Sequence, residues 1–80
     1  MPDVRSRLVT CFHTVFEGLS DTQIEESARN SMEEWDSVAA ITLVSVLEEE
    51  FNVQIDYERL PEFDTFSKIL NYLTRDLGVR

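Results

Sequence analysis

The run from Ser37 to Phe51 constrains the fold most, because it contains no glycine or proline and consists largely of good helix formers and aliphatic residues. Asp36 stands before it, and both Asp and Ser cap helix N-termini through a side-chain oxygen that accepts from free N–H groups. At helical spacing, one broad face of this segment is apolar. The sequence therefore predicts a helix that begins at Asp36–Ser37 and buries five residues: Ala40, Leu43, Val44, Leu47 and Phe51.

Two branched aliphatic residues, Val38 and Ile41, fall on the opposite, polar face of this helix. Scattered exposed apolar residues are normal on protein surfaces. Their position beside Ser37, at the start of the helix, nevertheless favours a contact surface. The same spacing leaves the Ser37 hydroxyl open to solvent.

Two more helices flank this one in the sequence. Residues 4–18 carry apolar side chains at steps of three and four and end at Gly18, and Asp64 or Thr65 offers a cap for a final helix that ends at Gly78. Asp56 could cap a short turn over Tyr57–Leu60, which Pro61 would stop. We expect an all-α fold, a small four-helix bundle of three main helices and one short helix.

A long polar connection, residues 19–35, separates the first and second main helices. Residues 21–28 could form a short helical turn within it. Ile24, Met32 and Trp35 are expected to fix the connection to the bundle, Trp35 as a core anchor or else as a contact for a bound group. Residues 52–55 are expected to be extended.

Composition limits both size and partners. Eighty residues make one domain, residues 1–80, and sixteen acidic against seven basic residues give a net charge of −9. Phosphate backbones and anionic membrane surfaces are disfavoured, because binding to them depends on Lys and Arg. We therefore expect basic surfaces of other proteins as partners, no nucleic acid, no membrane, and a monomer.

Cysteine and histidine content leaves little room for catalysis. Cys11 is the only cysteine and His13 the only histidine, so an internal disulfide and a Cys/His metal cluster are excluded. The two lie about 200° apart on one helix, which excludes a dyad there. The N-terminus lacks a signal-peptide pattern and no run is long enough to cross a bilayer, which favours the cytoplasm.

The segment from Trp35 to Leu73 resembles the acyl carrier protein family. The resemblance is carried by Asp36-Ser37-Val38, Ile41, Leu43-Val44, the run Leu47–Phe51, and Ile55. It implies that Ser37 bears a covalent 4′-phosphopantetheine arm, transferred from coenzyme A by a phosphopantetheinyl transferase. Asp36 would support this modification by helping to position Mg²⁺ in the transferase complex, and the carrier itself would bind no metal.

The resemblance also implies a function. The arm would hold acyl or aminoacyl groups as thioesters and deliver them to enzymes of fatty-acid, polyketide or related specialised biosynthesis. Trp35 is less usual in fatty-acid carriers and favours a specialised pathway. Partner enzymes would contact two apolar and four acidic residues: Val38, Ile41, Glu48, Glu49, Asp56 and Glu58.

Two rival interpretations remain open. The chain could be an acidic helical protein-interaction domain that has the carrier fold but is never modified, and its acidic run could simply keep the helix soluble. A small enzyme is disfavoured, because the local sequence offers no general base to activate the Ser37 hydroxyl. A Gly-rich phosphate loop is also absent from the sequence.

Overall fold

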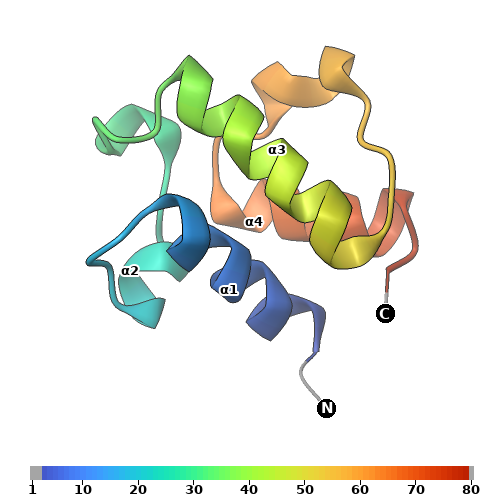
Figure 1. The fold of residues 1–80 in the computed structure, drawn as a ribbon, viewed down its shortest axis with the longest axis horizontal. Coiled ribbons are helices and arrows are strands. Elements are labelled where there is room, and N and C mark those ends of the chain that lie inside the picture. Colours follow the sequence, from blue (N-terminus) through green and yellow to red (C-terminus); the bar gives the residue numbers. More distant parts are fainter. Residues whose placement is uncertain (1–2, 80) are drawn as a thin grey trace.

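The computed structural model describes residues 3–79, which form an all-α fold of three main helices and several short ones (Figure 1). This confirms the predicted fold class. Within residues 3–79 there is no strand, and the only β-type contact is an isolated antiparallel bridge between Ala28 and Thr65. No helix in that range is both long and apolar enough to cross a membrane.

The first helix, α1, spans Val4–Val15. The carboxylate of its N-cap, Asp3, accepts a hydrogen bond from the Ser6 N–H over 2.8 Å. The helix ends before the expected Gly18, because the backbone becomes extended at Phe16 and left-handed at Gly18 (φ +83°). Phe16 consequently turns its side chain into the core, whereas Leu19 is only half-buried.

The connection after α1 contains the predicted short helical turn, which ends at Glu25 rather than at residue 28, and a second turn that was not predicted. It contains α2 (Asp21–Glu25), capped reciprocally by Ser20 and Gln23, and a 3₁₀ turn, η1 (Arg29–Ser31). Ile24 is fully buried. Trp35 is only 2 % exposed, with its ring 5.4 Å from Phe12 and 5.7 Å from Phe16, so its predicted role as a core anchor is confirmed.

The central helix, α3, spans Ser37–Phe51, packs beside α1 and passes in front of α4 in the view of Figure 1. All five residues predicted for its inner face are buried. The helix ends at Asn52, which has left-handed backbone angles (φ 53°, ψ 52°) and donates its N–H to Glu48 O. Asn52 is therefore not extended as expected, and residues 53–55 belong to no helix or strand.

The C-terminal part contains η2 (Tyr57–Glu62), α4 (Phe66–Asn71) and a wider π-type turn, η3 (Tyr72–Asp76). The prediction that Pro61 ends the short helix is wrong. Proline has no N–H to donate, but the 3₁₀ helix continues past Pro61 to Glu62. The Phe63 N–H then donates a hydrogen bond to Leu60 O over 3.0 Å. Thr65 caps α4 through the Lys68 N–H, as expected.

A single cluster of buried apolar side chains joins these elements, and α1 packs against α2, α3 and α4. Apolar residues at helical spacing in the first and last helices supply much of it: Val4, Leu8, Cys11, Phe12, Phe66, Ile69 and Leu73. Four further buried residues do not follow from that spacing: Val9, Phe16, Phe63 and Tyr72. This packing leaves the outer face of α3 and its N-terminus uncovered.

Candidate functional site

The N-terminus of α3 presents Ser37 as an exposed residue in the first helical turn. Asp36 accepts the Ala39 N–H on its Oδ1 over 2.8 Å, and its carbonyl accepts the Ala40 N–H over 2.9 Å. The cap thus fixes the backbone on both sides of Ser37. A helix N-terminus favours an anion, because its free N–H groups and the helix dipole are both positive there.

Arg29 supplies a contact to Ser37 that sequence analysis missed. Its Nη2 donates a hydrogen bond to Ser37 Oγ over 3.0 Å. Arg29 lies in the polar connection, eight residues before the serine, and no helical or strand spacing relates the two positions. Only the folded connection brings this cation to the hydroxyl.

The two apolar residues predicted on the outer face of α3 are exposed. Val38 is 72 % exposed and Ile41 is 50 % exposed. Tyr57, at the start of η2, is 51 % exposed and was not singled out by sequence analysis. The sequence did place Tyr57 in the first turn after the predicted cap Asp56. A tyrosine in a short turn can be buried or exposed, so this position alone did not predict an exposed side chain.

The four predicted acidic residues differ in their surroundings. Glu49 and Glu58 are exposed. Glu48 is half-buried, and its Oε2 accepts the Ile55 N–H over 2.9 Å, which ties α3 to the segment before η2. Asp56 is exposed, but its Oδ1 accepts the Glu58 N–H over 2.9 Å and caps η2. Glu48 and Asp56 therefore have structural roles in addition to any role in docking.

Cys11 and His13 are separated from this site. Cys11 is buried in α1, and burial together with the nearby Glu50 carboxylate raises the pKa of its thiol to about 11. His13 Nε2 lies 2.8 Å from Asp21 Oδ1 at the surface. Within residues 3–79, no group of His, Cys, Asp and Glu side chains could hold a metal ion.

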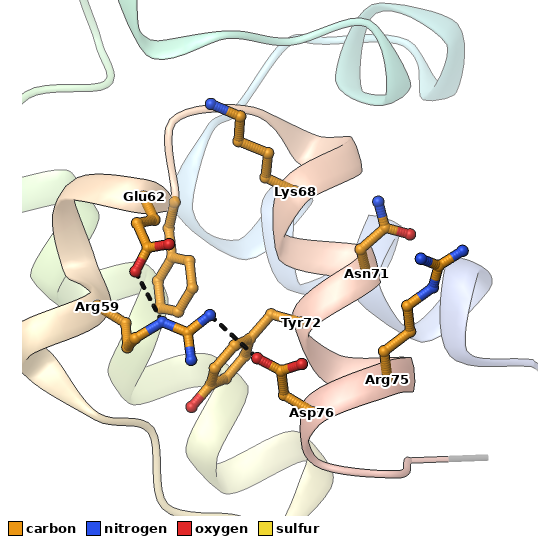
Figure 2. A pocket seen from close by; sticks show the side chains of 8 residues that line it. Arg59, Glu62, Lys68, Asn71, Tyr72, Arg75 and Asp76 are labelled. Carbon is orange, nitrogen blue, oxygen red and sulfur yellow. Dashed lines mark hydrogen bonds and ion pairs between the residues drawn. The ribbon is translucent and has the colours of Figure 1, made fainter.

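A cavity of about 310 Å³ lies elsewhere, between η2, α4 and η3 (Figure 2). Arg59 crosses it: Nε lies 2.7 Å from Glu62 Oε2, and Nη2 lies 3.0 Å from Asp76 Oδ2. The guanidinium also lies 5.0 Å from the centre of the Tyr72 ring. Neither Ser37 nor Asp36 lines this cavity, so we assign it no part in the attachment site.

The fold and this site define a class of protein, a small all-α domain with an exposed serine at a helix N-terminus. Residues 7–73 match the family described as phosphopantetheine attachment site. The match covers most of the chain, so the protein belongs to this family, whose members are non-catalytic carriers with 4′-phosphopantetheine bound covalently to a serine. Neither the curated proteins nor the solved structures gave a match.

The residues at the start of α3 fit this cofactor. An exposed hydroxyl is available for modification, the helix N-terminus favours the negative charge of a phosphodiester, and Arg29 places a cation against the same oxygen. The buried, protonated Cys11 thiol cannot take the place of the thiol of the arm.

Proposed function

We propose that Ser37 is the attachment residue and that this protein carries acyl or aminoacyl intermediates for enzymes of fatty-acid, polyketide or related specialised biosynthesis. The observation that carries the proposal is the exposed Ser37 hydroxyl in the first turn of α3, directly after a cap formed by Asp36. When bound, the cofactor supplies a terminal thiol that holds these groups as thioesters.

The residues of the chain prepare Ser37 to be modified rather than to catalyse. The Asp36 cap fixes the backbone of the first turn and leaves Oγ at the surface. Arg29 donates a hydrogen bond to Oγ and so cannot act as a general base, because a guanidinium remains protonated. The general base that removes the Ser37 proton would therefore come from a phosphopantetheinyl transferase. Coenzyme A would donate the phosphopantetheine arm.

The partner surface that we propose consists of Val38 and Ile41 on α3, flanked by acidic residues. Glu49, Asp56 and Glu58 would face basic side chains of the transferase and of loading enzymes. Glu48 would contribute less than an unengaged carboxylate, because one of its oxygens is already bound to the Ile55 N–H. Cytoplasmic location and a monomeric state stay predictions from the sequence.

Intact-mass measurement tests the proposal. Folded apo-protein is incubated with coenzyme A, Mg²⁺ and a broad-specificity phosphopantetheinyl transferase, beside Ser37→Ala and Ser45→Ala. Ser45 is a matched control, because it is an exposed serine on the same helix. We expect one phosphopantetheine on the wild type and on Ser45→Ala and none on Ser37→Ala.

Two results would contradict the proposal. A gain on Ser37→Ala would show that the attachment residue is another one. No gain on folded wild type with more than one transferase would favour the alternative function, an acidic interaction domain that has the carrier fold and is not modified.

A further inference from the structure

Arg29 makes a contact with the proposed attachment atom that the carrier function alone does not require. Its Nη2 lies 3.0 Å from Ser37 Oγ. We propose that Arg29 is a phosphate-binding residue, whose guanidinium holds the phosphodiester that joins the arm to Ser37. This inference rests on the proposed attachment at Ser37.

Arg29 forms no direct ion pair with a carboxylate within residues 3–79, although the hydrogen bond from Lys68 and, after it, the charge of Arg29 lower the pKa of Asp64. Four other basic side chains there do form ion pairs with carboxylates: Arg5, Arg7, Arg59 and Lys68. Arg29 instead donates to a neutral hydroxyl, although the protein has a net charge of −9. Hydrogen bonds from a guanidinium to an anion are shorter and stronger than those to a neutral acceptor, so a phosphodiester at this position would strengthen the contact.

The backbone of Arg29 is held in place by the segment before α4. The Arg29 N–H donates to Asp64 O over 2.7 Å, and the adjacent Ala28 pairs with Thr65 in the antiparallel bridge. The side chain is thus presented to Ser37 from a fixed position, which limits the conformational entropy lost when it binds an anion.

Asp64 is the competing anion for this guanidinium. Its Oδ1 lies 2.9 Å from Lys68 Nζ, so its carboxylate already has a cationic partner. Asp36 would repel a phosphodiester on the next residue, because its own carboxylate is negative. Arg29 and the N-terminus of α3 offset that repulsion, which gives the cation a specific role at this site.

A different account is that Arg29 only ties the connection to α3. Modification replaces the Ser37 hydroxyl that Arg29 bonds with an ester oxygen, which is a poorer acceptor, so the structural role predicts that the Arg29 guanidinium exchanges with water as fast as before or faster. Phosphate binding predicts slower exchange in the holo-protein, because the guanidinium then donates to an anion.

The test compares the side-chain Nε–Hε signals of arginine in uniformly ¹⁵N-labelled apo- and holo-protein, after intact mass has established conversion. We expect the Arg29 signal to shift and its exchange with water to slow in the holo-protein. Arg75 is the control within the same sample, because it also has no ion-pair partner among residues 3–79 and lies in η3. Its signal should stay unchanged.

Variants provide a second measurement through the ³¹P signal of the holo-protein. We expect this signal to move in Arg29→Gln, to move less in Arg29→Lys, and to match the wild type in Arg75→Gln. Backbone amide spectra show whether each variant is folded, and the arginine signals of the wild type decide the question if Arg29→Gln does not fold.

The outcomes separate the two proposals. Exchange of the Arg29 Hε with water that is as fast in the holo-protein as in the apo-protein, or faster, with conversion complete, would overturn phosphate binding and leave the carrier function intact. No mass gain on the wild type would overturn both.

Discussion

At the residue scale, Cys11 shows how burial separates two thiols that differ in function. Its side chain lies in the core on the inner side of α1, where burial raises the pKa of the thiol from 9.0 to about 11. A thiolate is the reactive form of cysteine, so Cys11 is unreactive at neutral pH in the folded protein. The arm would therefore provide the one accessible thiol of the holo-protein.

Thiol labelling under native conditions checks this prediction. With Ellman's reagent at pH 8, we expect no rapid labelling of folded apo-protein and one rapidly labelled thiol in the holo-protein. The holo form of Cys11→Ala should also give one. Rapid labelling of the folded apo wild type would contradict the buried position of Cys11.

The same pKa shift makes the free energy of unfolding depend on pH. Because the folded-state pKa is above the unfolded value, the contribution of Cys11 is complete below about pH 9 and is lost as pH rises toward about 11. The free energy of unfolding, measured with urea between about pH 9 and pH 11, should fall more steeply with pH in the wild type than in Cys11→Ala. Equal slopes in both proteins would contradict the raised pKa of Cys11.

At the scale of the elements, η2 depends on Arg59 for its position. The side chain of Arg59 joins η2 to η3 through Glu62, Asp76 and the Tyr72 ring (Figure 2). The two carboxylates accept hydrogen bonds from its guanidinium and raise the pKa of Arg59. No residue of η2 is fully buried and only Leu60 packs partly against the core, so the contacts of Arg59 add to a weak apolar attachment.

Amide hydrogen exchange tests this role. We expect Arg59→Ala to accelerate exchange in Tyr57–Glu62 and Tyr72–Asp76 while α1 stays protected, because the lost contacts are local. Arg5→Ala is a matched control, since Arg5 forms a 3.4 Å ion pair with Glu25 that joins α1 to α2 and involves neither η2 nor η3. Arg59→Lys should recover only part of the protection, because an ammonium lacks the planar fork that bonds two carboxylates at once. Unchanged exchange in η2 of Arg59→Ala would contradict the role.

Helix positions were largely predictable from sequence, whereas their ends were less so. Asp36 and Thr65 are caps in the structure because capping depends on local side-chain chemistry. The early end of α1 at Val15 and the passage of η2 through Pro61 are accompanied by burial of Phe16 and Phe63, which local patterns do not reveal. The wide turns of η3 carry no sequence signal of their own.

At the scale of the whole molecule, the proposed docking surface combines exposed apolar residues with a net charge of −9. The exposure of Val38 and Ile41 followed from helical periodicity alone. The Arg29–Ser37 contact and the Glu48–Ile55 contact did not, because both join segments that only the tertiary fold brings together. Sequence therefore predicted an exposed Ser37 and its exposed apolar neighbours but not the cation beside it.

The charge part of this surface is testable with the transferase as the partner. Glu49→Gln should raise the KM for the carrier by up to about fivefold at low salt, since exposed ion pairs contribute about 0.2–1 kcal/mol. The effect should decrease with added salt, because exposed charges are screened. Glu17→Gln makes the same change of charge at an exposed site after α1 and should leave KM unchanged. Equal effects of the two variants would assign the effect to net charge rather than to docking.

Mass spectrometry of the holo-protein locates the arm on the chain. Holo-protein is digested, and fragmentation of the peptides assigns the phosphopantetheine to one side chain. We predict that all of it is on Ser37, at the N-terminus of α3, and none on Ser31 or Ser45, which are also exposed. Phosphopantetheine on any other residue would contradict the central claim.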